Sequence, residues 1–99
     1  MVWASDLVVA EDVRLTSVSA SLSSVIILEA NEHRKRVMLY NNSNSFCCIS
    51  FLEVSSTALF SFKMSPGSMY ECFDNPIYLG DISAIWLTSS TGSMMVTEM

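Results

Sequence analysis

The apolar residues of this chain fall in runs that are too short and too irregular to build helices. A helix requires apolar residues every three to four positions over ten or more residues, together with capping signals. The runs are instead about five to eight residues long and are separated by Ser, Asn, Pro and Gly, which is typical of strands in a sandwich or barrel. The sequence therefore predicts an all-β fold, either a single antiparallel β-sandwich or a jelly-roll-like barrel of about eight short strands.

Alternation of apolar and polar residues indicates where these strands lie. We expect them within residues 14–19, 25–29, 36–40, 46–53, 59–64, 69–73, 77–79, 82–87 and 94–98. The run 25–29 is apolar on both faces, which predicts a central strand. Residues 41–44 are predicted to form a turn because Asn tolerates left-handed backbone, and Pro66-Gly67 fits the centre of a type II turn. The Ser-rich residues 17–24 fit a loop, an edge strand or a small-residue packing surface.

The chain carries more apolar material than a domain of its size can easily bury. Its 99 residues are enough for one core, so we expect a single domain over residues 1–99. Hydrophobic residues make up 51% of the chain and charged residues 15%. The excess apolar surface predicts contacts with copies of the same chain or with a larger assembly, and therefore a homo-oligomer or a docked subunit.

Residues 1–12 are predicted to form an N-terminal arm that packs on a neighbouring subunit. Their apolar side chains precede the first clear strand and would be costly to expose. Methionines near the other end of the chain favour adaptable packing at an interface. The candidate interface residues are Val2, Trp3, Leu7, Val8, Val9, Met94 and Met95.

The sequence argues against a membrane and against nucleic acid as partners. The apolar run at residues 25–28 is far shorter than the ~20 residues of a spanning helix. The acidic residues Asp6, Glu11 and Asp12 are unlike the basic start of a secretory signal, so we expect assembly in the cytoplasm. The net charge of −5 disfavours binding to phosphates. The basic cluster at residues 33–36 is interpreted as a solvated loop in preference to a phosphate-binding patch.

The cysteines and the histidine do not form a recognisable catalytic or metal motif. Cys47, Cys48 and Cys72 have neither disulfide-framework nor paired zinc-ligand spacing. Cys47 and Cys48 are adjacent and should point to opposite faces of one strand, as small buried hydrophobes that stay reduced. His33 has no nucleophile placed beside it by a known motif and is interpreted as a solvated loop residue.

Carboxylates and aromatic rings are the remaining candidates for binding groups. Convergence of Glu71, Asp74 and Asp81 at one end of the sheet would suit a glycosidase pair or a calcium site, but a solvated rim is favoured. The aromatic residues are assigned to the core or to a subunit interface in preference to a sugar-stacking platform. They are Trp3, Tyr40, Tyr70, Tyr78 and Trp86. We predict no catalytic residue, no cofactor and no metal.

Two stretches of the chain resemble small virion proteins of tailed bacteriophages and prophages. The first is residues 30–43, a basic loop followed by an apolar strand and an Asn-rich segment. The second runs from Pro66-Gly67 through residues 80–86, which end in Ile-Trp, to the terminal Val-Thr-Glu-Met at 96–99. This chain has Ala84 where such proteins often have glycine, and Met95 where they often have a basic residue.

The resemblance implies a non-enzymatic virion structural protein. The expected role is a capsid decoration or cement protein that stabilises the head shell through oligomeric contacts with the major capsid protein or a neck or tail protein. An alternative of a different class is a receptor- or carbohydrate-binding module of a tail or head fibre. The expected location is the virion.

Overall fold

The computed structural model describes residues 13–73, 77–89 and 91–99, and these residues form eight strands and no helix. The strands are β1 (Arg14–Ser19), β2 (Val25–Leu28), β3 (Arg36–Ser43), β4 (Cys47–Ser50), β5 (Phe62–Met64), β6 (Met69–Phe73), β7 (Ile82–Trp86) and β8 (Gly92–Glu98). The predicted all-β class is confirmed. The strand predicted at residues 77–79 is wrong, because these residues lie in the connection between β6 and β7. In the described part of the chain, no helix is present that could cross a membrane.

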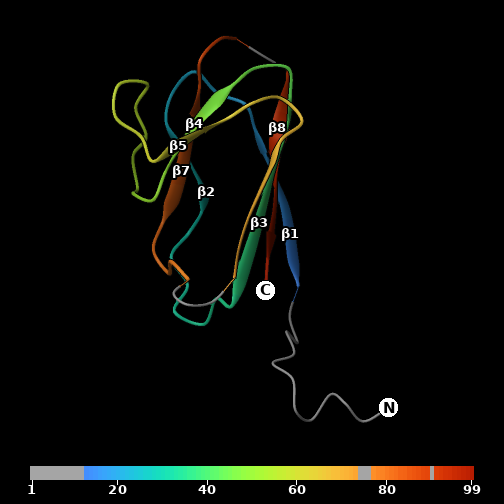
Figure 1. Cartoon of the computed structure of the whole chain (residues 1–99), viewed down its shortest axis with the longest axis vertical. Helices are drawn as coiled ribbons and strands as arrows, with labels where there is room; N and C mark the ends of the chain where they lie inside the picture. Colours follow the sequence, from blue (N-terminus) through green and yellow to red (C-terminus); the bar gives the residue numbers. More distant parts are fainter. Residues whose placement is uncertain (1–12, 74–76, 90) are drawn as a thin grey trace.

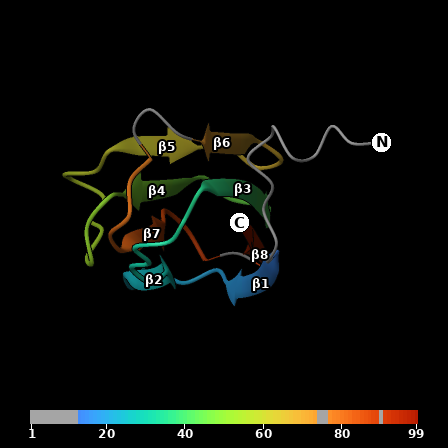
Figure 2. The same cartoon turned by 90° about the horizontal axis from the view of Figure 1, so that it is seen from below.

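The strands form two antiparallel sheets that face each other (Figures 1 and 2). Sheet A has the order β1-β8-β3-β6, and sheet B has the order β2-β7-β4-β5. The chain crosses from one sheet to the other at every connection except that between β4 and β5. This strand order is that of a jelly roll, which selects one of the two architectures that the sequence left open.

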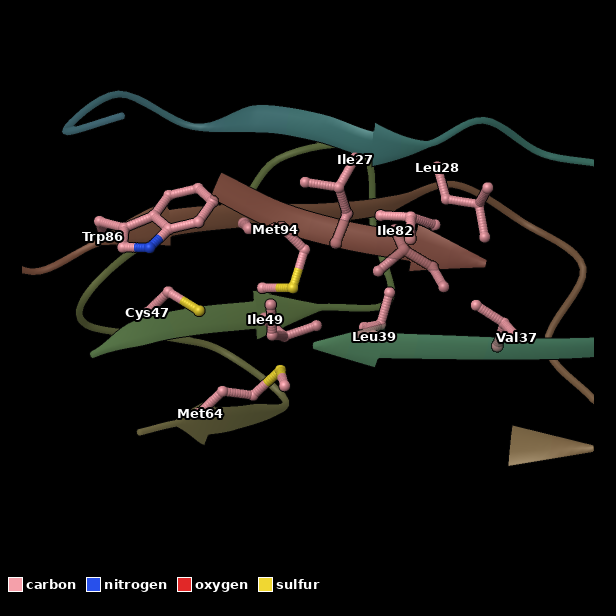
Figure 3. Packing of buried hydrophobic residues seen from close by; sticks show 12 residues of the cluster. Ile27, Leu28, Val37, Leu39, Cys47, Ile49, Met64, Ile82, Trp86 and Met94 are labelled. Atoms are coloured by element: carbon pink, nitrogen blue, oxygen red, sulfur yellow. The ribbon is translucent and has the colours of Figure 1, made fainter. Parts of the chain in front are cut away.

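Alternation along the strands sends one set of apolar side chains into the space between the sheets (Figure 3). Trp86 is the largest side chain of this core, and its indole Nε1 donates a 3.0 Å hydrogen bond to Ser43 Oγ. The indole is therefore buried without leaving its N–H unsatisfied. The core consists of Ile27, Leu28, Val37, Leu39, Cys47, Ile49, Met64, Ile82, Ala84, Trp86, Met94 and Val96.

β2 is an edge strand of sheet B and not the central strand that its apolar sequence predicts. Its pairing with β7 shifts register between Ile26 and Leu28. This bulge sends both Ile27 and Leu28 into the core, whereas Ile26 remains exposed on the outer face. The apolar run at residues 25–28 is therefore explained by the bulge in an edge strand and not by burial of both faces of a central strand.

The Asn-rich segment at 41–44 is not the predicted turn, because β3 continues through Ser43. Asn41 is fully buried, and its Nδ2 donates to the carbonyl oxygens of Ser45 at 2.9 Å and Met64 at 3.1 Å. Its Oδ1 accepts a 2.6 Å hydrogen bond from Ser43 Oγ. The amide thereby ties β3 to the start of β4 and the end of β5, which keeps a buried polar group satisfied.

The predicted turn at Pro66-Gly67 is confirmed. Gly67 has a φ of 79°, the left-handed value that the third position of a type II turn requires. The turn connects β5 to β6, and so carries the chain from sheet B to sheet A.

Candidate functional site

One lateral edge of the sandwich is closed by aromatic rings. β5 and β6 face each other at this edge (Figure 2), and Phe51, Phe62, Tyr70 and Tyr78 pack between them and the neighbouring loops. The ring centroids of Phe62 and Tyr70 are 4.6 Å apart, and those of Phe51 and Tyr78 are 5.2 Å apart. Burial, with a smaller contribution from Cys72, raises the pKa of Tyr70. Tyr70 and Tyr78 are partly buried against other aromatic rings and do not form an exposed stacking platform.

The opposite lateral edge, between β1 and β2, is open. A cleft of about 470 Å³ lies there, within the size range of ligand-binding pockets. Its floor and walls combine apolar side chains of the core with polar groups at one end. The lining residues are Arg14, Thr16, Val18, Ile27, Leu28, Glu29, Ala30, Asn31, Val96 and Glu98.

A buried ion pair forms the polar end of this cleft. Arg34 Nε donates a 2.9 Å hydrogen bond to Glu98 Oε2, and the Arg34 side chain is 0% exposed. Its Nη1 donates to the carbonyl oxygens of Tyr78 and Gly80, and its Nη2 donates to that of Glu29. The guanidinium thus compensates the buried carboxylate and joins two backbone segments, at Glu29 and at residues 78–80.

The solvated loop predicted at residues 33–36 is therefore wrong for two of its four residues. Arg34 is buried, and Arg36 is half-buried on the outer side of sheet A, where its Nε donates to Glu71 Oε2 at 3.1 Å. His33 and Lys35 are exposed, as expected. Arg34 is held by a carboxylate because a buried guanidinium requires a counter-charge, whereas the partly exposed Arg36 pairs with Glu71 at the surface.

The second oxygen of Glu98 is turned toward the cleft. Glu98 Oε1 lies 3.6 Å from Nη1 of Arg14, whose side chain is largely exposed. Glu98 Oε2 also accepts a 3.2 Å hydrogen bond from Asn31 Nδ2. The carboxylate is consequently anchored on its inner side and only loosely engaged on its outer side, where a group entering the cleft would meet it.

The outer face of sheet A carries an uncovered row of apolar side chains. Met95, Tyr40 and Met69 are direct cross-strand neighbours on β8, β3 and β6, and they are 41%, 41% and 60% exposed. Met38 and the exposed Leu15 lie in the next row. We call these five residues the sheet A face. The only charged residues in the register rows of this face are Arg36 and Glu71, which pair with each other.

Part of the outer face of sheet B, at β4, is covered by the chain itself. β4 ends at Ser50 and β5 begins only at Phe62, so both predicted strands are too long. Residues 51–61 fold back over the sheet, with Ser55 Oγ 3.0 Å from Ser50 Oγ and donating to the Cys48 carbonyl oxygen. Ser55 N also donates to Ser24 Oγ at 2.7 Å. On the outer face of sheet A, by contrast, Met95, Tyr40 and Met69 remain exposed.

The structure separates the two methionines that were predicted at an interface. Met94 is 0% exposed and belongs to the core, so its assignment to an interface is wrong, whereas Met95 points outward on the sheet A face. Adjacent strand residues point to opposite sides of the sheet, which places them in different environments. The other five predicted interface residues, at positions 2, 3 and 7–9, lie outside the described residues.

The remaining candidate groups are accounted for by local contacts. Cys47 lies in the core and Cys48 beneath the covering loop, which confirms their opposite orientations and burial. Burial raises the pKa of Cys47 to about 12 and also raises that of Cys48. Asp81 Oδ1 accepts a hydrogen bond from Ala30 N, and Asp74 lies outside the described residues. Among the described residues, no group of three or more His, Cys, Asp or Glu could hold a metal ion.

Sequence reasoning missed both the cleft and the ion pair at its end. One signal for the ion pair is present in β8. Glu98 shares the inward parity of Met94 and Val96, so it places a carboxylate at a core position, and such a charge needs a buried partner. The partner lies 64 positions away, and no periodicity points to Arg34.

Comparison with protein-family models, with curated proteins and with solved structures finds no match to this chain.

Proposed function

We propose that this chain is a non-enzymatic structural protein of a tailed-phage virion, a capsid decoration or cement protein that docks through the sheet A face. The observation that carries the proposal is the apolar row of Met95, Tyr40 and Met69, on a face whose charged residues, Arg36 and Glu71, pair with each other. Contiguous apolar patches depleted of charge mark protein interfaces, whereas single exposed apolar residues are ordinary.

The virion assignment is supported by the resemblance of residues 30–43 and 66–99 to phage structural proteins. Jelly rolls also occur among viral capsid domains, so the fold is compatible with this role. A flat sheet face suits docking on a preformed shell because it needs no rearrangement of either partner. The shell presents many identical sites, so weak individual contacts stabilise it collectively.

The catalytic alternative receives no support from the groups that would carry it. His33 Nε2 lies 3.5 Å from Glu32 Oε1, and both side chains are exposed to solvent. Of the aromatic residues considered for the carbohydrate-binding alternative, Tyr70 and Tyr78 pack against Phe51, and Trp86 lies in the core. We therefore favour docking over both.

The proposal is tested on particles assembled from the genome that encodes the chain. The chain should be present in purified particles in a fixed ratio to the major shell protein. Met95→Glu should remove it from the particles, because an isolated carboxylate in an apolar contact lacks a partner. Thr57→Glu adds the same charge on the exposed loop over sheet B and should leave incorporation unchanged.

Two results would contradict the proposal. If the wild-type chain is absent from purified particles, the virion assignment is wrong. Equal incorporation of Met95→Glu and Thr57→Glu would show that the chain docks through a surface other than the sheet A face. Solubility and circular dichroism of each variant establish that the fold is retained.

A further inference from the structure

We propose that the cleft between β1 and β2 receives residues 1–12 of a second copy of this chain. The inference deepens the proposed function. It rests on that function for one point, that copies of the chain lie next to one another in an assembly. The sheet A face would dock on the shell, and the cleft would join neighbouring copies to each other. The two contacts involve different residues and are separable by mutation.

The cleft has the properties of a site for an extended polypeptide segment. β1 and β2 are both edge strands, so each presents one side of its backbone without a strand partner. Val18, Ile27 and Leu28 line the cleft with apolar surface, and Arg14 lies at its polar end. Edge strands beside an apolar groove are the elements that β-strand addition uses.

β1 itself is poorly covered in the isolated chain. Arg14 and Thr16 point toward the sheet B side but remain exposed, and Leu15 on the other face is 73% exposed. At the opposite edge of the sandwich, Phe51 and Tyr78 fill the corresponding space. An added segment at β1 would supply the cover that aromatic side chains supply at β5 and β6.

Residues 1–12 have the composition and the attachment point of the occupant. They contain Val2, Trp3, Leu7, Val8 and Val9, and they precede β1 directly. Their charged residues are all acidic, and the polar end of the cleft carries Arg14 together with Glu29 and Glu98, so the occupant is argued from its apolar residues and not from its charge.

The length of residues 1–12 and the scarcity of turn residues just before β1 indicate that the segment in the cleft comes from a second copy and not from the same chain. The inward side of β1 lines the cleft from Arg14 to Val18, about 13 Å at ~3.3 Å per residue. Twelve extended residues reach about 40 Å, which covers the cleft and the path between copies. Filling its own cleft would require the chain to reverse just before β1. Residues 7–13, which lead into β1, contain no Gly, Pro, Asn or Ser, and Asp12 is their one residue of a type common in turns.

The test uses the full chain with the photo-crosslinking amino acid p-benzoylphenylalanine in place of Thr16. Isotope-labelled and unlabelled copies are mixed, irradiated and mapped by mass spectrometry. We expect crosslinks from position 16 of one copy to residues 1–12 of a copy of the other label. The same amino acid in place of Ser19, which projects from the other face of β1, is the matched control and should not give these crosslinks.

A second measurement is independent of the crosslinker. Thr16→Arg places a long charged side chain in the cleft, and light scattering over a concentration series should show self-association weakened by about tenfold or more. Ser19→Arg carries the same charge and should leave the association unchanged.

Crosslinks confined to single copies, or none to residues 1–12, would overturn the inference. Equal association of Thr16→Arg and Ser19→Arg would overturn it as well. Neither result bears on incorporation of the Met95→Glu variant into particles, so failure of the cleft contact and failure of sheet A docking are distinguishable.

Discussion

Replacing Arg34 with Met should destabilise the folded protein by about 3–5 kcal/mol, the cost of breaking a buried ion pair by removing one partner. The substitution retains much of the apolar volume and removes the guanidinium. Glu98 would then keep only Asn31 and the distant Arg14 as partners for a nearly buried charge. The carbonyl oxygens of Glu29, Tyr78 and Gly80 would also lose their donor. The loss is a large part of the 5–15 kcal/mol that stabilises a typical domain.

The free energy of unfolding is measured by urea denaturation followed by circular dichroism. Lys35→Met is the matched control, since the neighbouring Lys35 is exposed, and its effect should stay within about 0.5 kcal/mol. The double variant Arg34→Met/Glu98→Leu should recover about 2 kcal/mol relative to the sum of the single changes, because no unpaired charge remains. A loss below about 1 kcal/mol for Arg34→Met, or strict additivity in the double variant, would refute the reasoning.

Three further predictions concern the backbone, the aromatic edge and alkaline pH. Gly92→Ala should cost at least about 2 kcal/mol in urea unfolding, because φ is 109° and a Cβ would collide with the backbone oxygen of Asn42. Gly67→Ala has open space around it and should cost about 1 kcal/mol. Phe51→Ala should lower stability by about 2–3 kcal/mol, and an unchanged midpoint would remove the aromatic cluster as a stabilising element. Burial raises the pKa of Cys47 from 9.0 to about 12, so the folded state retains a proton that the unfolded state loses. Stability should fall between pH 9 and 12 by about 1.4 kcal/mol per unit, and Cys47→Ala should lose about 2 kcal/mol less than the wild type between pH 8 and 10.5.

Local patterns sufficed for the fold class and for several elements. The strands at 14–19 and 69–73 begin and end where alternation predicts, and the positive φ of Gly67 follows from its place after Pro66. Opposite orientations of Cys47 and Cys48 follow from the two-residue period of a strand. All of these features depend on residues close together in the chain.

The predictions that were wrong concern features that depend on contacts between residues far apart in the sequence. A bulge in β2 turns an apolar run into an edge strand, and the amide of Asn41 finds buried carbonyls that make a turn unnecessary. Residues 51–61 leave their strands to cover sheet B. In each case, tertiary packing overrides a local preference whose energy is smaller.

The sequence by itself determined that this chain would form short strands around one core with apolar surface to spare, because alternation and turn chemistry act over a few residues. Only the tertiary structure decided where that surface lies. The fold leaves the sheet A face exposed, lays residues 51–61 over part of sheet B and separates β1 from β2 to form the cleft. It also brings Arg34 to Glu98, since a charge buried by one strand requires a partner that only the folded chain can place beside it.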